Sequence, residues 1–284
     1  MWDQELQRWA RGIEDFATTH FDIYRTENFR APKILLDSVM YSLNGGGKRF
    51  RPMLAMMVAN HYEADPMRVL PWACAVEMVH TYSLIHDDLP CMDDDDVRRG
   101  RPTNHKVYGE SIALLAGDAL LTEAFALVCK FYQTEPDVAI QLLDRLSAAS
   151  GLQGMISGQV EDMQADKNPV DAEKLISIHK LKTGQLIRVA LEGAGIACGA
   201  SRNDLLALKF YGENLGLAFQ IKDDLLDAQE GGEETKNFVA LIGTEKTETL
   251  LHDISVKAKT YLNKLQKPSV KLLNMVDYNT SRTK

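Results

Sequence analysis

The chain has 284 residues, 45% of them hydrophobic, which is enough to form a sizeable core in one large domain, with two smaller domains as the alternative. Its formal net charge of −8 disfavours a nucleic-acid-binding protein, because such proteins usually carry a basic surplus. The four cysteines lie far apart and form no CxxC pair, which excludes a small disulfide scaffold and the common zinc-ligand spacings. We therefore expect a single domain over residues 1–284, in the cytoplasm. The sequence shows neither a signal-like apolar N-terminus nor an apolar stretch long enough to span a bilayer.

Helical periodicity dominates the rest of the chain. Apolar residues recur at spacings of three and four from Trp72 to His86, which marks one face of a helix. Further long helices are predicted over 110–132, 139–163, 172–198 and 204–227. Signals for strands are poor, with no sustained alternation and no Asn-Gly turn. The pattern predicts an all-α bundle of long, largely buried helices.

A glycine-rich basic turn comes before these helices, with the sequence GGGKRFRP at residues 45–52. It is not a P-loop, but its glycines would let backbone N–H groups approach an anion. Lys48 and Arg51 are three residues apart and would share a face if a helix begins here. The turn is interpreted as an anion site rather than as a solvated basic turn.

The first acidic cluster is the strongest signal in the sequence. Residues 80–96, HTYSLIHDDLPCMDDDD, carry an apolar helix into six carboxylates within ten residues, and Pro90 should end that helix. Acids at a helix C-terminus are disfavoured by the macrodipole and repel one another, so a bound Mg²⁺ is expected. An acidic solvated loop is the alternative. The cationic run RRGRP at 98–102 favours a site for a phosphate ester instead.

A second acidic cluster, FQIKDDLLD at residues 219–227, repeats this arrangement. Asp223 and Asp227 are four residues apart and share a helix face. Taken alone, this second motif is a weak signal, because an exposed acidic helix turn is at least as common. Two clusters, each at the end of an apolar helix, suggest facing helix ends with metal ions between them.

Two further positions carry a functional interpretation. Gly184, in the run KTGQ at 182–185, lies within a predicted helix and would distort it, pointing a carbonyl or the Thr183 hydroxyl into a cavity. Close helix packing at Gly184 is the alternative. His80 lies two turns before Asp87 and faces roughly the same way, so it could hydrogen-bond a diphosphate.

The motifs GGGKRFRP, HTYSLIHDDLPCMDDDDVRRGRPTNH, KTGQL and FQIKDDLLD together resemble the trans-isoprenyl diphosphate synthase family, and within it the bacterial farnesyl diphosphate synthases. The resemblance covers about residues 43–250. It implies an isoprenoid-synthase-type all-α fold around a deep central cavity. It also implies isoprenoid diphosphates as substrates, three Mg²⁺ ions per active site and a homodimer.

The resemblance assigns roles residue by residue. The residues that match metal ligands are Asp87, Asp93, the neighbouring Asp88, Asp223 and, indirectly, Asp227. Those that match the isopentenyl diphosphate site are Lys48, Arg51, His80 and Arg99. Those that match the allylic diphosphate site are Arg98, Lys182, Thr183, Gln220 and Lys236.

The implied reaction is ionisation of the allylic diphosphate and attack by the isopentenyl double bond. The Thr183 hydroxyl, the Lys182 carbonyl and Gln220 would stabilise the allylic cation, and the departing diphosphate would take the proton. Tyr82, five residues before Asp87, would form the floor of the cavity. An aromatic side chain there implies a C15 product, farnesyl diphosphate.

One segment departs from the family pattern, and three alternatives remain open. The loop at 228–235 is short, which puts Lys236 in doubt as a ligand. A terpene cyclase shares the fold but typically lacks the basic isopentenyl site. A geranylgeranyl diphosphate synthase, with a C20 product, is opposed mainly by Tyr82. A non-catalytic partner subunit that binds prenyl diphosphates is kept open by the short loop.

Overall fold

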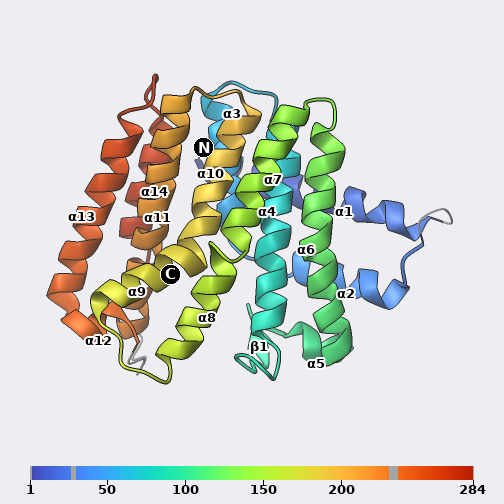
Figure 1. The fold of residues 1–284 in the computed structure, drawn as a ribbon, viewed down its shortest axis with the longest axis horizontal. Coiled ribbons are helices and arrows are strands. Elements are labelled where there is room, and N and C mark those ends of the chain that lie inside the picture. Colours follow the sequence, from blue (N-terminus) through green and yellow to red (C-terminus); the bar gives the residue numbers. More distant parts are fainter. Residues whose placement is uncertain (1, 27–29, 230–235, 284) are drawn as a thin grey trace. The chain divides into compact units, whose positions relative to one another are not determined.

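The computed structural model of the chain describes residues 2–26, 30–229 and 236–283. Helices make up nearly all of its regular structure (Figure 1), so the predicted all-α class is confirmed. The chain divides into two compact units, the first with residues 1–56 and 65–143 and the second with 57–64 and 144–284. The boundary lies within two helices, α3 (Phe50–His61) and α7 (Pro136–Ser150). The prediction of one domain over 1–284 stays a prediction.

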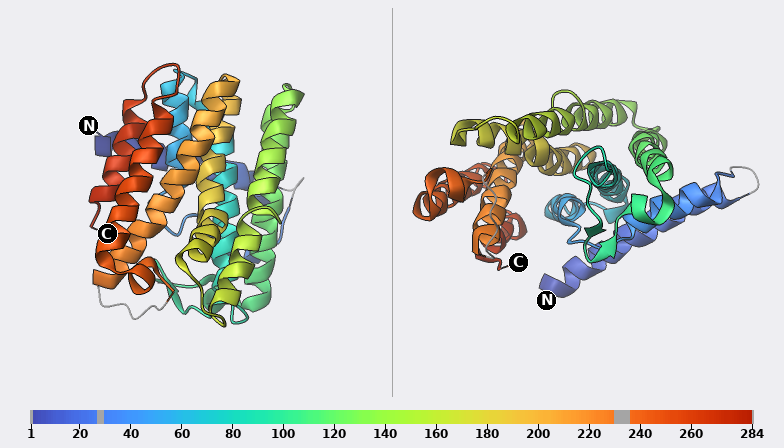
Figure 2. Two further views of the ribbon diagram at one scale, coloured as in Figure 1. Left: turned by 60° about the vertical axis from the view of Figure 1, so that its left-hand side comes forward. Right: turned by 90° about the horizontal axis from the view of Figure 1, so that it is seen from below.

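In the first unit, α4 and α6 run side by side, and α6 also packs against α2 and α5. Helix α1 contacts α4 and lies across these helices when they are seen end-on (Figure 2, right). The elements of this unit are α1 (Trp2–Asp22), the 3₁₀ turn η1 (Ile23–Arg25), α2 (Lys33–Leu43), α4 (Pro66–Asp87), β1 (Val97–Arg98), β2 (Arg101–Pro102), α5 (Asn104–Tyr108) and α6 (Glu110–Tyr132).

In the second unit, α11 packs along both α10 and α13, and α14 contacts α11 and α13. Buried apolar residues of α11, α12 and α13, including Ile221, Phe238 and Ile254, form a core cluster there. The elements are α8 (Met155–Ala165), α9 (Ala172–His179), the π-helical η3 (Lys180–Gly184), α10 (Gln185–Ala197), α11 (Arg202–Gln229), α12 (Phe238–Ile242), α13 (Thr244–Leu262) and α14 (Val270–Ser281).

The predicted helices agree with the structure except where glycines interrupt them. The helix predicted over 110–132 coincides with α6, and those over 72–86 and 204–227 lie within α4 and α11. The prediction of one helix over 139–163 is wrong, because the chain turns between α7 and α8. At Gly154 a Cβ would lie 2.0 Å from the carbonyl oxygen of Ala149, so only glycine allows this turn.

A short hairpin, β1–β2, escaped the sequence interpretation. Its two central residues, Arg99 and Gly100, have φ of 53° and 74°, as in a type I′ turn. The Arg-Gly pair at the centre of this turn is the only local sequence signal for it. This pair is less characteristic of a type I′ turn than Asn-Gly is. The hairpin positions the cationic run that follows the first acidic cluster.

Helix α6 meets the length and composition requirements of a membrane-spanning helix, contrary to the expectation that no stretch would do so. The helix is long and apolar, and it contains few charged residues. Helices in the core of a globular protein meet the same requirements, and α6 buries part of its surface against α2, α4 and α5.

A buried ion pair attaches the glycine-rich turn to helices α1 and α4 of the same unit. The Arg49 guanidinium, 4% exposed, lies 2.9 Å from Glu77 of α4 and 3.0 Å from Glu14 of α1. It also donates to the Leu43 carbonyl oxygen at 2.6 Å. Arg49 therefore has a structural role, although it lies between two cations predicted to bind an anion.

We expect Glu77→Ala to lower the free energy of unfolding by about 3 kcal/mol, because it leaves Arg49 buried with an incomplete set of partners. Chemical denaturation of wild type and variant measures the difference. Glu135→Ala is the control, since it removes a solvent-exposed partner of Arg68 and should change stability little. Equal losses from the two variants would contradict a special role for the buried pair.

Candidate functional site

A tight backbone turn brings together the two ends of the first acidic motif. Helix α4 ends at Asp87, and Pro90 follows in a turn, as predicted. The Asp93 amide donates to the carbonyl oxygen of Asp87 at 2.8 Å. The two predicted metal ligands thus lie beside each other, with Asp87 half-buried and Asp93 exposed.

Arg98 neutralises part of this cluster. It donates from Nε to Asp88 Oδ1 at 2.5 Å and from Nη2 to Asp95 Oδ2 at 2.9 Å. Asp88 is only 4% exposed, and burial raises the pKa of its carboxyl despite the opposing effect of Arg98. Asp88 and Arg98, assigned respectively to metal and to diphosphate, are therefore bound to each other.

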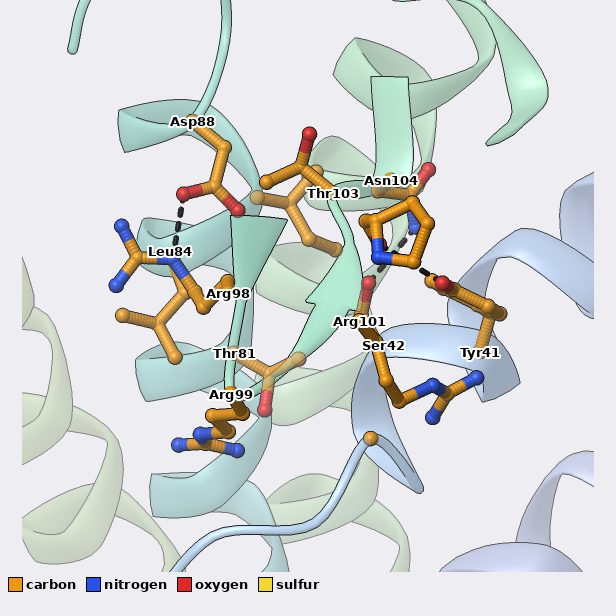
Figure 3. A pocket seen from close by; sticks show the side chains of 13 residues that line it. Tyr41, Ser42, Thr81, Leu84, Asp88, Arg98, Arg99, Arg101, Thr103 and Asn104 are labelled. Carbon is orange, nitrogen blue, oxygen red and sulfur yellow. Dashed lines mark hydrogen bonds and ion pairs between the residues drawn. The ribbon is translucent and has the colours of Figure 1, made fainter. Parts of the chain in front are cut away.

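A cleft in the first unit is lined by this ion pair and the hairpin. Figure 3 shows Asp88 and Arg98 in contact on one side, Arg99 below them, and Arg101 directed towards Tyr41. The Arg101 guanidinium lies 4.1 Å from the centre of the Tyr41 ring. The empty volume of the cleft, about 400 Å³ with its open mouth, is lined by side chains of α2, α4 and the hairpin.

The glycine-rich turn approaches the hairpin through Arg99. Arg99 donates to the carbonyl oxygen of Gly46, and a Cβ at Gly47 would lie 2.5 Å from its guanidinium carbon. Gly47 also has a φ of 112°, which disfavours any side chain there. The Arg99 guanidinium therefore packs directly over the backbone of Gly47, whose positive φ favours glycine at this position.

The other predicted isopentenyl-site residues lie in separate elements of the same unit. Lys48 is exposed and precedes α3, whereas Arg51 lies in the first turn of that helix. The two residues therefore do not share a helix face, which would have required a helix that begins before Lys48. His80 lies on α4. Burial, with the nearby cations Arg51 and Arg99, holds the pKa of His80 well below its ordinary value, so its ring is neutral at pH 7.

Tyr82, the predicted floor residue, is a buried side chain of α4. It is 5% exposed, its ring centre lies 5.6 Å from that of His86, and its hydroxyl has no hydrogen-bond partner among the described residues. Burial, with the nearby carboxylate of Asp87, raises the pKa of Tyr82 to about 12. Tyr82 does not line the cleft of Figure 3.

In the second unit, α11 carries Gln220, Asp223 and Asp227. Asp223 accepts from Gln220 Nε2 at 3.3 Å and from Arg282 Nη2 at 2.5 Å. Arg282, near the end of the chain, also donates to the Phe219 carbonyl oxygen and stacks on that ring. Arg282 of the C-terminal segment thus brings a cation to a predicted ligand. No role was predicted for Arg282 from the sequence.

The neighbouring acid, Asp224, has a structural role. It is 8% exposed, and its Oδ2 accepts the backbone amide of Phe238 at 2.7 Å. Asn237 caps α12 by accepting from the Ala240 amide at 2.7 Å. These two bonds fix the start of α12, beside Lys236.

The predicted distortion at Gly184 is present as the π-helical segment η3, which joins α9 to α10 (Figure 1). Such segments are frequent at functional sites. Close packing occurs there as well, since a Cβ at Gly216 of α11 would lie 2.8 Å from Gly184 Cα. Thr183, within η3, is buried.

Lys182 and Lys236 meet at one carboxylate. Asp162 of α8 lies 2.5 Å from Lys182 Nζ and 2.8 Å from Lys236 Nζ. Lys236 follows the short loop 228–235, of which residues 230–235 lie outside the described part of the chain. Two residues assigned to the allylic site are thus brought together by an acid that sequence reasoning missed. The Gln-x-x-Asp run at 159–162 was its only signal.

The donor set fits Mg²⁺. Within residues 2–26, 30–229 and 236–283, no group of three His, Cys, Asp or Glu side chains converges to hold a metal alone. Mg²⁺ characteristically takes one or two carboxylates and completes its shell with phosphate oxygens and water. Accessible carboxylates such as Asp87, Asp93 and Asp223 are suited to that kind of binding.

Asp224→Ala should lower the free energy of unfolding by about 1–3 kcal/mol, because the buried Phe238 amide loses its acceptor. Asp227→Ala, at an exposed position of the same helix, is the control and should change stability much less. Denaturant unfolding of both variants is the measurement. A neutral result for Asp224→Ala would show that its contact with α12 contributes nothing.

The polyprenyl synthetase family model matches residues 32–266 of the chain. The chain is 47% identical over 211 residues to the farnesyl diphosphate synthase of Bacillus subtilis (strain 168), a match that covers 74% of this chain and 71% of that enzyme. It is 40% identical over 262 residues to the farnesyl diphosphate synthase of Micrococcus luteus, with 88% and 90% covered. The crystal structure of an FPP/GFPP synthase from Zymomonas mobilis matches with a TM-score of 0.87 and 34% identity, covering 98% of each chain. The chain therefore belongs to the polyprenyl synthetase family.

Proposed function

We propose that the protein is a trans-prenyltransferase that condenses isopentenyl diphosphate with dimethylallyl and then geranyl diphosphate to form farnesyl diphosphate. The observation that carries this proposal is the pairing of Lys182 and Lys236 at Asp162, on the same unit as Asp223. Two adjacent ammonium groups on the unit that carries an accessible carboxylate are suited to a metal-bound diphosphate. The relatives named farnesyl diphosphate synthase support the reaction.

We assign the metal-ligand role to Asp87, Asp93, Asp223 and Asp227, with Asp88 next to the first of them. These residues would hold three Mg²⁺ ions per site, the number that the resemblance to the family implies. When bound, Mg²⁺ would neutralise the charge of the diphosphate and so favour its departure. The protein would contribute accessible carboxylates at the end of α4 and along α11.

The cationic residues would form two groups, each of which binds one of the two substrates. Lys48, Arg51 and Arg99, with the neutral ring of His80, would hold isopentenyl diphosphate. The allylic diphosphate would be bound by Arg98, Lys182, Thr183, Gln220 and Lys236. The contact of Gly47 with Arg99 supports the first assignment, because it joins the glycine-rich turn to the hairpin.

Ionisation of the allylic C–O bond leaves a cation that must be stabilised without being trapped. The Lys182 carbonyl and Thr183 hydroxyl of η3, with the Gln220 amide oxygen, would supply partial negative charge. The double bond of isopentenyl diphosphate then attacks the cation, and the released diphosphate takes the proton. Burial of Thr183 supports this role, because it keeps water from the hydroxyl.

We propose further that the enzyme is a cytoplasmic homodimer. The apolar side chains of Leu114 and Leu115 on α6 are 46% and 52% exposed, as expected for a surface that a second copy covers. None of the four cysteines forms a disulfide in the structure, which suits a reducing compartment.

Product analysis tests the reaction. Purified protein with Mg²⁺, isopentenyl diphosphate and either dimethylallyl or geranyl diphosphate should yield mainly a C15 alcohol after dephosphorylation, and EDTA should abolish it. A dominant C20 alcohol would favour geranylgeranyl diphosphate synthesis. Absence of elongation from either primer would favour a non-catalytic partner subunit.

Tyr82 sets the product length in this proposal. Tyr82→Met should shift most of the product from C15 to C20 or longer, because a flexible side chain replaces the rigid ring. Tyr82→Phe is the matched control: it keeps the ring and removes only a hydroxyl that has no hydrogen-bond partner among the described residues. Chain-length analysis of the alcohols would contradict the role if both variants kept a C15 product.

A further inference from the structure

The Asp162 carboxylate lies between two cations from distant parts of the chain. Its Oδ2 is 2.5 Å from Lys182 Nζ, and its Oδ1 is 2.8 Å from Lys236 Nζ. Lys236 Nζ also donates to the carbonyl oxygen of Asp162 at 3.1 Å. One residue of α8 therefore holds side chains from η3 and from the segment before α12.

The backbone fixes this contact as well. Gly158 lies one helical turn before Asp162, on the same face of α8. A Cβ at Gly158 would lie 2.3 Å from the amide nitrogen of Lys182, so α8 and η3 touch at their backbones. The π-helical turn carrying Lys182 is thus seated on α8 at the place where Asp162 projects.

The Asp162 carboxylate lies between two cations, and a second carboxylate, that of Asp166, contacts Lys236. The Asp162 side chain is 17% exposed, against 31% for Lys182 and 24% for Lys236. The pKa of the nearby His179 is lowered to about 4 by burial, so its ring adds no charge at pH 7. Without the Asp162 carboxylate between them, the two ammonium groups would repel each other.

We propose that Asp162 is a positioning residue that sets Lys182 and Lys236 at the spacing needed to bind the diphosphate of the allylic substrate. This inference rests on the proposed function. Lys182 donates to one oxygen of Asp162, and its ammonium group has two further N–H donors for phosphate oxygens. Lys236 contacts Asp162 through both its carboxylate and its carbonyl oxygen and also contacts Asp166, so it would exchange one of these contacts for a phosphate oxygen. Asp162 itself would not touch the substrate, so its effect would reach the allylic diphosphate through the lysines alone.

Asp162→Asn tests the proposal, because it removes the charge and keeps the shape. We expect the KM for geranyl diphosphate to rise about tenfold or more, while the KM for isopentenyl diphosphate changes less than about twofold. Asp162→Glu, which restores the charge, should recover part of the loss. An unchanged or lower KM for geranyl diphosphate, or an equal rise for both substrates, would overturn the proposal.

Asp166→Asn is the matched control. The Asp166 side chain is 61% exposed, and among the described residues its ion pair is with Lys236, so its loss should leave the KM for geranyl diphosphate nearly unchanged. If Asp162→Asn does not fold, as judged by circular dichroism, Asp162→Ser replaces it with the same expected outcome. A double-mutant cycle with Lys236→Met separates positioning from general disturbance, because positioning requires the effect of Asp162→Asn to shrink when Lys236 is absent.

Failure of this inference is distinguishable from failure of the proposed function. Elongation by the wild-type protein establishes the function independently of Asp162. If the wild type elongates and the two KM values of Asp162→Asn rise together, the function stands and the positioning role is wrong. If the wild type does not elongate, the proposed function fails, and the positioning role, which rests on it, fails too.

Discussion

Ion pairs between carboxylates and cations from distant segments determine where the candidate site residues lie. Asp88 is bound to Arg98 of the hairpin, Asp223 to Arg282 near the chain end, and Asp162 to two lysines. Acids near a helix C-terminus repel one another and oppose the macrodipole, so each cluster depends on cations brought from elsewhere. In each unit the charges of the acidic cluster are therefore already partly balanced by protein cations.

Glycines decide how closely the segments that carry these charges approach each other. Gly47 leaves room for the Arg99 guanidinium, and Gly158 lets α8 touch η3 at Lys182. Gly216 does the same between α11 and Gly184. A methyl group at Gly158 or Gly216 would push apart two backbones, and the charges that the shifted segments carry would move with them. Packing and electrostatics are thus coupled at the same few residues.

The sequence predicted what depends on local pattern and missed what depends on contact between distant segments. Helix α6 was predicted to the residue, because its Ala/Leu-rich sequence contains no proline. The turn between α7 and α8 was missed, because helical periodicity continues on both sides of Gly154 while the close contact with Ala149 is invisible in the sequence. Asp162 and Arg282 were missed for a related reason: their partners lie at least 20 residues away along the chain.

The two Asp-Asp pairs show why motif residues of one type have different roles. Successive residues on a helix point about 100° apart, so one member of each pair faces inward while the other stays accessible. In the first pair Asp88 is 4% exposed and bound to Arg98, whereas Asp87 is half-buried. In the second pair Asp224 is 8% exposed and holds the Phe238 amide, whereas the Asp223 side chain is 33% exposed. Asp87 and Asp223 are therefore the more exposed member of each pair, although Asp223 already accepts hydrogen bonds from Gln220 and Arg282. A metal ion at Asp223 would have to share this carboxylate with the Arg282 guanidinium or displace it.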